Sequence, residues 1–181
     1  GAGNQKTWTL SFWTKRGKLS YSNDLIGCYS SSSDTGNLEA RFTTSDQFGV
    51  VLWNYYTYTT AVFRDPSAWY HVVLVVDTTQ AGTSSGSKIK VYINGTLQEW
   101  STDPISSSVA QNTDLIWNST AAQYIGRWTS ADGNGYFYDG HITDMNFVGG
   151  QALTPSSFGQ TNAITGVWEP KPYTGTYGTN G

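Results

Sequence analysis

Two neighbouring stretches decide the fold class: residues 71–76 read HVVLVV, and residues 88–95 read KIKVYING. The first is apolar on both faces, which is typical of a central strand covered from both sides. The second alternates aliphatic side chains with lysine and tyrosine and ends in Asn94-Gly95. Alternating apolar residues before Asn-Gly are the strongest short-range signal of a β-hairpin. The region therefore predicts a central strand followed by a tight hairpin.

Strand signals recur along most of the chain, and no stretch keeps an apolar period of 3.6 residues. Residues 7–13 alternate large apolar side chains with threonine and serine, as a half-buried strand does. Further short strands are expected at residues 48–53, 97–100, 115–117 and 124–126. Many short strands between Gly, Ser, Asn and Asp turns predict an all-β fold, a two-sheet antiparallel β-sandwich of the jelly-roll kind.

A late apolar pattern, Ile142, Met145 and Phe147, is spaced by three residues and then by two. A strict strand would keep a spacing of two throughout. A β-bulge near Thr143-Asp144 would absorb the extra residue and keep all three side chains on the core face. We interpret Asp144 at this bulge as a buried, hydrogen-bonded structural residue.

The composition predicts one domain with a changed segment at its end. Residues 1–165 have the length of a single domain, whereas residues 166–181 are rich in Pro, Gly and Tyr. We interpret the latter as an extended tail or linker that leaves the domain. The chain starts at Gly1 and stops inside this tail, so we expect it to be a piece of a longer protein.

Charge and cysteine content exclude several classes of protein. Charged residues make up 13% of the chain, the formal net charge is -3, and the pI is about 5.1. Nucleic-acid binding draws on clusters of Lys and Arg, so nucleic acid is not an expected partner. No apolar run approaches the roughly 20 residues of a membrane helix, so membrane insertion is not expected either. The single cysteine, Cys28, cannot form an internal disulfide and fits a buried apolar position in a protein assembled in a reducing cytosol.

Four segments together resemble laminin-G/pentraxin-like domains: WTLSFW at 8–13, WYHVV at 69–73, KVYING at 90–95 and FYDGHI at 137–142. Their order and rough spacing agree with the opening strand, the central pair and the late strand of that family. The resemblance covers about residues 7–158 and implies a concanavalin A-like lectin/glucanase jelly roll.

The end of the chain is similar to a narrower group. The segments GGQALTPSSFG (149–159), TGVW (165–168) and YTGTYG (173–178) resemble laminin-G-like virion proteins of tailed marine bacteriophages. This resemblance implies a virion protein on the particle surface, in a tail fibre or decorating the capsid. Such a protein would be assembled in the host cytoplasm, would be multimeric in the particle, and would have glycans or other virion proteins as partners.

The residues that carry hydrolytic chemistry are missing from the pattern. Glycoside hydrolysis needs two carboxyl groups a few ångströms apart, but Glu39 and Glu99 are isolated in the sequence. His71 and His141 have no second His or Cys at ligand spacing, and we interpret both as structural. We therefore expect a protein that is not an enzyme.

Calcium is the one cofactor that the residues leave open, since related domains often bind it. The candidate ligands are Asp132, Asn134 and Asp139, which surround two glycines. Ca²⁺ requires about 6–8 oxygen ligands, several of them charged. An ordinary Asp/Asn/Gly turn explains the same residues, and we favour this alternative.

The aromatic residues, 15% of the chain, are the better lead to a site. Four of them crowd residues 53–58, where strand alternation must send some outward, and three others sit beside polar turns. Exposed Trp and Tyr rings stack on sugar rings and anchor protein interfaces, while buried ones fill a sandwich core. The glycan-binding candidates are Trp53, Tyr55, Tyr56, Tyr58, Trp117, Trp128 and Tyr136.

Three functions are compatible with these residues. The first is a virion surface module that binds host or environmental glycans in adhesion. The second is a structural domain of the capsid or tail fibre without a sugar ligand, and the third is a glycan-cleaving enzyme. The fold alone does not choose among them.

Overall fold

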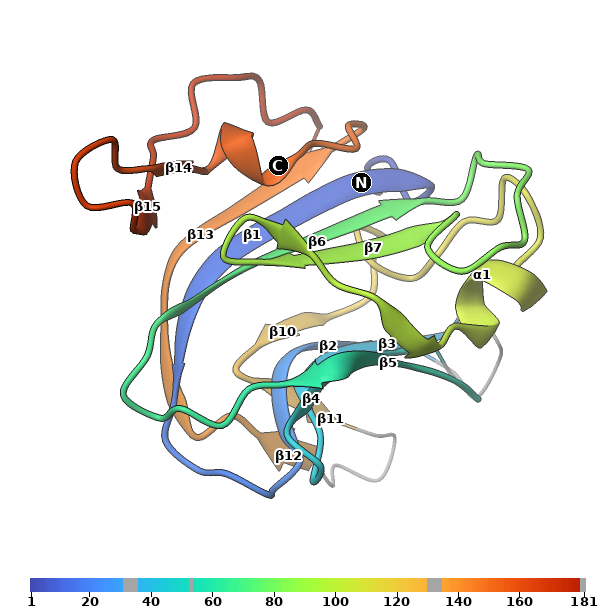
Figure 1. The fold of residues 1–181 in the computed structure, drawn as a ribbon. Coiled ribbons are helices and arrows are strands. Elements are labelled where there is room, and N and C mark those ends of the chain that lie inside the picture. The colour runs from blue at the N-terminus through green and yellow to red at the C-terminus, as the bar shows by residue number, and fades with distance from the viewer. Residues whose placement is uncertain (31–35, 53, 130–134, 180–181) are drawn as a thin grey trace.

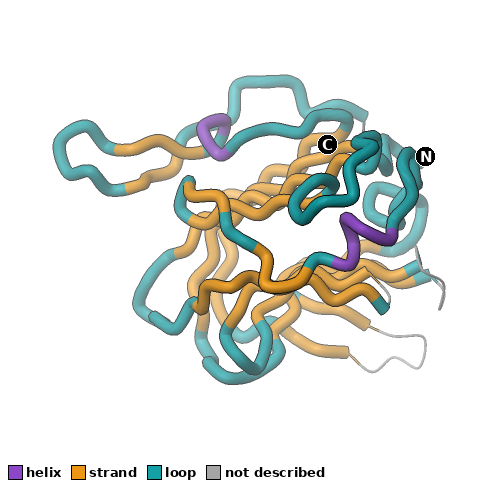
Figure 2. Tube along the Cα trace, turned by 45° about the vertical axis from the view of Figure 1, so that its right-hand side comes forward, coloured by secondary structure: helices purple, strands orange, loops and turns teal. Residues whose placement is uncertain are grey.

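Two antiparallel sheets packed face to face form the body of the molecule (Figure 1). The computed structural model describes residues 1–30, 36–52, 54–129 and 135–179. Sheet A has the strand order β13-β1-β6-β7-β8, and sheet B has the order β10-β2-β3-β4-β5-β9. The predicted all-β two-sheet sandwich is therefore confirmed, and helix is confined to short connecting pieces (Figure 2).

The bounds of the elements follow. Sheet A consists of β1 (Thr7–Arg16), β6 (Tyr70–Asp77), β7 (Ile89–Ile93), β8 (Thr96–Leu97) and β13 (Gly140–Gly149). Sheet B consists of β2 (Asn23–Tyr29), β3 (Asn37–Phe42), β4 (Gln47–Leu52), β5 (Tyr55–Val62), β9 (Trp100–Thr102) and β10 (Gln123–Ile125). The remaining elements are the hairpins β11 (Arg127–Thr129) with β12 (Gly135–Phe137) and β14 (Gly159–Thr161) with β15 (Trp168–Pro170), the helix α1 (Pro104–Ser108) and the 3₁₀ turn η1 (Pro155–Ser157).

The core fills the space between the sheets with alternate residues of the long strands. Trp8 and Phe12 of β1 and Leu74 of β6 meet Leu38 of β3 and Phe48 of β4, and all are buried. The buried thiol of Cys28 belongs to the same core, and burial raises its pKa to about 11. No helix among the described residues combines the length and apolarity that crossing a lipid bilayer requires.

The two strongest local predictions are confirmed. Strand β6 lies in the middle of sheet A between β1 and β7, which explains why residues 71–76 are apolar on both faces. Asn94 and Gly95 form the two-residue turn between β7 and β8 with φ values of 50° and 80°. Positive φ at both positions is the signature of a type I′ turn.

The predicted bulge in β13 is also confirmed. The pairing of β13 with β1 shifts between Ser11 and Trp13, and Asp144 has a φ of 49°. Met145 consequently packs on the core together with the apolar residues on either side of it. The interpretation of Asp144 as a buried residue is wrong, because the extra residue of the bulge turns its side chain out to solvent.

Two local predictions are corrected by the structure. Trp100 does not lie on the strand that returns from the hairpin: the chain crosses to sheet B after Leu97, and Trp100 pairs with Thr59 on β5. Residues 115–117 form turns instead of a strand, although they are buried. Their apolar side chains fill the end of the core, which an irregular segment can also do.

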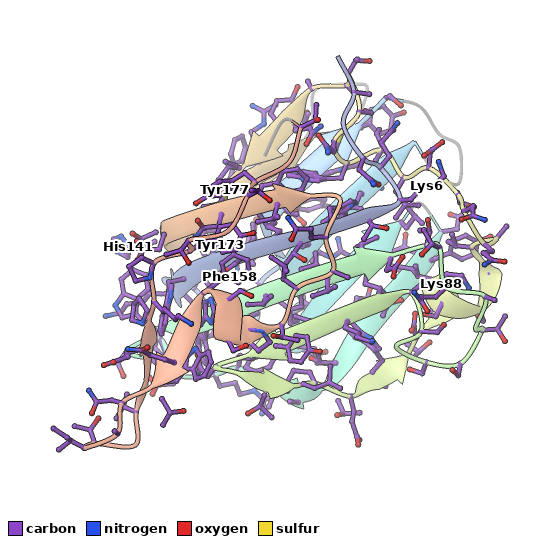
Figure 3. The ribbon with its side chains drawn as sticks, turned by 90° about the horizontal axis from the view of Figure 1, so that it is seen from above. Lys6, Lys88, His141, Phe158, Tyr173 and Tyr177 are labelled. Carbon is purple, nitrogen blue, oxygen red and sulfur yellow. The ribbon has the colours of Figure 1, made fainter. Side chains whose placement is uncertain are left out.

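The C-terminal segment, residues 150–179, lies back on the outer face of sheet A (Figures 1 and 3). The amide of Gly149 donates to the carbonyl of Tyr177 over 2.8 Å, and Phe158 packs with Val73, Val75 and Val148 in a second apolar cluster. The expectation that residues 166–181 leave the domain is therefore not met by the part of that segment that is described. Burying the apolar outer face of β6 lowers the free energy by more than the loss of conformational entropy of the segment raises it.

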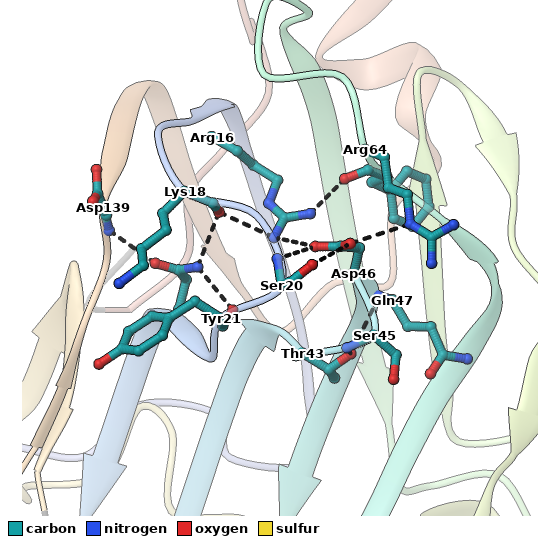
Figure 4. Close-up of polar contacts among 12 residues, drawn as sticks. Arg16, Lys18, Ser20, Tyr21, Thr43, Ser45, Asp46, Gln47, Arg64 and Asp139 are labelled. Atoms are coloured by element: carbon teal, nitrogen blue, oxygen red, sulfur yellow. Dashed lines mark hydrogen bonds and ion pairs between the residues drawn. The ribbon is translucent and has the colours of Figure 1, made fainter.

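A buried ion pair ties together the loops at one end of the sandwich (Figure 4). Asp46 has a φ of 63° in the turn between β3 and β4, and it accepts from the Arg16 guanidinium at 2.9 Å and from the backbone amide of Ser20 at 2.7 Å. Burial raises the pKa of Asp46, but the hydrogen bonds from Ser20, Arg16 and Arg64 lower it more, so the carboxyl is ionised. The pair fixes the β1–β2 loop against the β3–β4 turn.

Candidate functional site

The structure separates the seven aromatic candidates into different environments. Trp53 lies outside the described residues. Trp117 is buried against Trp8 and Phe147 and so belongs to the core, and Tyr55 points inward and packs on that core. For these two the structure realises the alternative that the sequence left open, a place in the sandwich core. The outer face of sheet B and its covering hairpin carry the remaining four, Tyr56, Tyr58, Trp128 and Tyr136.

Strand β3 supplies a row of polar side chains in the middle of that face. Leu38, Ala40 and Phe42 of β3 lie in the core, so the alternate residues face outward. We call these residues the polar row: Asn37, Glu39 and Arg41. Neighbouring β4 places Gly49 and Val51 outward beside them, so the row is bordered by small side chains.

A continuous chain of hydrogen bonds links the polar row to an aromatic ring at each end. The Trp128 indole Nε1 donates to Asn37 Oδ1 at 2.7 Å, and Asn37 Nδ2 donates to Glu39 Oε1 at 3.0 Å. Arg41 Nη1 donates to Glu39 Oε2 at 3.0 Å, and Arg41 Nη2 lies 3.4 Å from the Tyr58 hydroxyl. The chain holds these polar side chains in fixed orientations before any ligand arrives.

The first aromatic wall comes from the hairpin β11–β12, which lies against the outer face of β2 (Figure 1). Gly27 of β2 makes this contact possible, since a Cβ there would lie 2.6 Å from the Trp128 backbone. The Trp128 and Tyr136 rings stack with centroids 6.1 Å apart, and Tyr29 meets Trp128 edge-on at 6.3 Å. Tyr136 keeps 47% of its surface exposed, so this wall presents an open ring to solvent.

The second aromatic wall comes from β5. The Tyr58 ring lies over Gly49, where a Cβ would approach the ring to 2.6 Å. Tyr56 lies two residues away on the same face, with its ring centroid 6.3 Å from that of Tyr58. The absence of a side chain at residue 49 therefore lets the Tyr58 ring lie against the sheet.

A pocket of about 450 Å³ opens at the Arg41 end of the polar row, between the two walls. Its rim includes Tyr21, which is 44% exposed and lies under the Lys18 ammonium at 3.8 Å from the ring centroid. The Asp46 ion pair holds the two loops that carry this rim. The lining residues are Tyr21, Ser22, Arg41, Thr43, Thr44, Ser45, Gln47, Tyr58 and Tyr136.

Asp24 of β2 lies beside the polar row and has no counterpart among the sequence predictions. It is fully buried next to Glu39 and Arg41, and neither carboxyl oxygen has a hydrogen-bond partner in the part of the chain that is described. Burial raises its pKa to about 8, the Glu39 charge adds to the rise, and Arg41 opposes it. The group is therefore protonated at neutral pH.

Glu39 is the second buried carboxyl of this face, and it lies on the neighbouring strand. Burial raises its pKa, whereas the hydrogen bond from Asn37 and the Arg41 charge lower it. The expectation that Glu39 is isolated holds for the sequence but not for the fold, because the register of β2 on β3 brings Asp24 opposite Arg41. Both carboxyls are at least 96% buried, so neither reaches a ligand in the pocket in this conformation.

Tyr21, Arg41 and Asp24 were not predicted from the sequence. A signal for Arg41 was present, because residues 37, 39 and 41 alternate with three apolar residues. No local signal marks Asp24, since its neighbours are brought to it by strand pairing.

The calcium candidates are tested only in part. Asp132 and Asn134 lie outside the described residues. Asp139 is exposed, its backbone amide donates to Asn23 Oδ1 at 3.2 Å, and its carbonyl accepts from the Gly17 amide at 2.8 Å. The described residues contain no group of three or more His, Cys, Asp or Glu side chains that could hold a metal ion.

A protein-family model matches most of the sequence. The model described as "Concanavalin A-like lectin/glucanases superfamily" matches residues 2–157. The chain belongs to this superfamily. The match covers both sheets and ends at η1, so most of the C-terminal segment lies beyond it. A search of the curated proteins finds no match to the sequence.

Solved structures of this superfamily's fold come from very different proteins. A heptameric SAP-like pentraxin from Limulus polyphemus is 15% identical with a TM-score of 0.57, and the alignment covers 84% of this chain and 68% of that one. The CBM40 of a Ruminococcus gnavus IT-sialidase, bound to α2,3-sialyllactose, is 14% identical with a TM-score of 0.57 and coverages of 84% and 80%.

Domain 4 of a GH43 extracellular arabinanase from Geobacillus stearothermophilus, in complex with arabinotriose, is 17% identical with a TM-score of 0.53. The alignment covers 86% of this chain and 65% of that domain. At these identities the likeness establishes the fold and leaves the ligand of this chain to its own residues.

Proposed function

We propose that this chain is a non-catalytic glycan-binding module whose site is the outer face of sheet B. The observation that carries the proposal is the polar row between two aromatic walls, with a pocket at its Arg41 end. Open rings such as Tyr136 offer faces for sugar rings, and fixed polar groups such as Arg41 offer hydrogen bonds for hydroxyl or carboxylate oxygens. The sialyllactose and arabinotriose complexes of the CBM40 and the arabinanase domain support the same class of ligand.

The burial of the carboxyls supports binding over hydrolysis. A glycosidase needs one acid and one base or nucleophile in contact with the glycosidic bond. Asp24 and Glu39 are neighbours, but both lie beneath the surface, and the Glu39 oxygens are already engaged by Asn37 and Arg41. Among the residues that the structure describes, this face therefore offers contacts to a sugar without an acid–base pair that can reach it.

A virion role would make a weak site sufficient. We propose that the domain is displayed in many copies on a phage particle assembled in the host cytoplasm, where it attaches the particle to host or environmental glycans. The resemblance of residues 149–178 to laminin-G-like virion proteins supports this location. Stacking on one or two rings suits dissociation constants near about 1 mM, or roughly -4 kcal/mol, and multivalent display raises the effective affinity.

A structural role in the particle is the second candidate, and one observation favours it. The β14–β15 hairpin projects beyond the sandwich, and the connection between its strands exposes Ile164 to 96% and Val167 to 62% (Figures 1 and 2). Exposed aliphatic side chains at a projecting turn suit contact with another virion protein. In that case the domain would decorate the capsid or a tail fibre without binding sugar.

A glycan array probed with a multimeric form of the domain tests the proposal. We expect the multimer to bind members of the array, and the variants Tyr58→Ala and Tyr136→Ala to lose that binding while remaining folded. Tyr177→Ala is the matched control, because it removes a partly exposed tyrosine from the opposite face. A folded multimer that recognises no glycan, including those of host surfaces, would favour the structural role.

A further inference from the structure

A slot lined by tryptophan opens on the other side of the molecule, between the C-terminal segment and sheet A. Its volume is about 270 Å³, and its lining is largely apolar. Three of the eight tryptophans of the chain line it, Trp13 from β1, Trp69 from just before β6 and Trp168 from β15. We call it the tryptophan slot, and the lining residues that matter are Trp13, Trp69, Trp168, Thr143, Asp144 and Glu169.

Trp168 is held in place by contacts that have nothing to do with the candidate site on sheet B. Its indole Nε1 donates to His71 Nδ1 at 2.9 Å, and the two rings stack with centroids 5.9 Å apart. A Cβ on Gly95 would approach this indole to 2.9 Å, and one on Gly159 would approach it to 2.5 Å. The Trp168 ring, which forms one wall of the slot, is thus packed closely against Gly95, Gly159 and His71.

The other two tryptophans complete the slot in different ways. Trp13 stacks on His71 with ring centroids 4.9 Å apart, so its position is fixed by the sheet. Trp69 keeps 41% of its surface exposed and lies 6.4 Å from the His141 ring. A tryptophan left this exposed beside two fixed ones is a surface that a ligand can cover at a gain in free energy.

The charged groups of the slot are acidic. Asp144 is turned outward by the bulge in β13, and Glu169 is held by Gln160 Nε2 and Asn162 Nδ2, each at 3.0 Å. Among the described residues, no Lys or Arg side chain lines the slot. The nearby Lys171 donates to the Ser156 carbonyl at 3.0 Å. Indole faces and carboxylates both favour a cation, so the slot selects for positive charge.

We propose that the tryptophan slot binds a protonated amino sugar. The apolar face of the sugar ring stacks on the Trp69 indole, and the ammonium group lies within reach of the Asp144 and Glu169 carboxylates. A neutral or N-acetylated sugar gains only the stacking. The slot is independent of the site proposed on sheet B and lies on the outer side of the opposite sheet, so one domain could bridge two glycan chains.

Titration of the intact domain with oligomers of glucosamine tests this assignment, with tryptophan fluorescence and calorimetry as readouts. The pH is set where the sugar amine is protonated. We expect binding of the glucosamine oligomer at least about tenfold tighter than that of the N-acetylated oligomer of equal length. Trp69→Ala and Asp144→Asn should each weaken it by about tenfold, because they remove the stacking face and one carboxylate.

Two controls separate this site from the other one and from bulk charge. Glu99→Gln removes an exposed carboxylate elsewhere and should leave the affinity unchanged. Tyr58→Ala should also leave the affinity for the glucosamine oligomer unchanged, even if this variant no longer binds glycans at the outer face of sheet B. Equal binding of the two oligomers, or undiminished binding by folded Trp69→Ala, would overturn the proposal.

Discussion

The outer faces of the two sheets differ in chemical character although both are built by the same strand alternation, and parts of both are buried. The outer face of sheet A lies under the C-terminal segment, and its central residues Val73 and Val75 are apolar and buried. The outer face of sheet B carries the polar row and open aromatic rings. The difference shows that the exposure of a sheet's outer face cannot be derived from its own strands. It depends on whether a segment distant in sequence packs on that face.

Each face also holds one titratable group with a strongly displaced pKa. His71 lies under Trp168 on sheet A, and burial lowers its pKa to about 4. Because Trp168 donates to Nδ1, the neutral ring carries its proton on Nε2 and donates to Ser11 Oγ at 2.9 Å. Asp24 on sheet B has a pKa raised to about 8, mainly by burial. Burial keeps both groups neutral, which gives them opposite pH dependences.

The largest expected effect comes from Asp24, because its folded-state pKa of about 8 lies about 4 pH units above its ordinary value of 3.8. The folded state holds the Asp24 proton up to pH 8 while the unfolded state loses it near pH 3.8, so this group makes stability fall across that window. His71 makes stability rise from pH 4 to pH 6.5, because only the unfolded state is protonated there. The two effects oppose each other at lower pH, and above pH 6.5 stability should fall by up to about 1.4 kcal/mol per pH unit.

Urea denaturation at a series of pH values measures this slope. Asp24→Asn should flatten the decline above pH 6.5, and His71→Gln should remove the opposing rise below it. A wild-type domain with equal stability at pH 6.5 and pH 8 would show that Asp24 is ionised in the folded state.

The next largest effect is expected when the contact between the C-terminal segment and sheet A is disrupted. Trp168→Ala removes the hydrogen bond to His71, the ring stack and the packing against Gly95 and Gly159. We expect the free energy of unfolding to fall by about 2–3 kcal/mol, less than for a fully buried tryptophan because Trp168 is only half-buried.

Trp69→Ala is the matched control for that loss. Its side chain is 41% exposed, and the cost should be below about 1 kcal/mol. Equal destabilisation by the two variants in urea would mean that Trp168 does not hold the C-terminal segment on the sheet.

A smaller effect is expected at the turn between β7 and β8. Gly95 has a φ of 80°, and a side chain there would also press on the Trp168 ring. Gly95→Val should therefore cost more than about 1 kcal/mol, because a β-branched residue resists this backbone conformation. Gly86→Val provides the comparison, since Gly86 has a φ of 74° with open space around it. Chemical denaturation should show a larger loss at Gly95, and equal losses would exclude a contribution from Trp168.

The sequence predicted what neighbouring residues determine. The Asn94-Gly95 turn, the central strand at 71–76 and the bulge at Asp144 each follow from spacing within a few residues, and each is confirmed. The family resemblance at 8–13 and its partner segments added the correct superfamily.

What the sequence did not predict depends on contacts between distant segments. Asp24 acquires its raised pKa from burial and from Glu39 on the next strand, and Trp168 finds His71 across 97 positions. Trp100 changes sheets because of a crossing that no local pattern marks. Arg41 is different, because the alternation of residues 37–42 marks it locally and the sequence reasoning missed that signal.

The smallest expected effect concerns calcium and bears on sheet B alone. Asp139 follows the hairpin that carries the Trp128 wall, so a bound ion there would stabilise this face and leave the cover of sheet A untouched. A ligand of the native state raises the melting temperature by mass action. We expect EDTA to leave the melting temperature of the domain unchanged, because Asp139 is exposed and its backbone groups already bond to Asn23 and Gly17. A fall of several degrees that added Ca²⁺ restores, and that Asp139→Asn abolishes, would instead establish a calcium site beside the glycan-binding face.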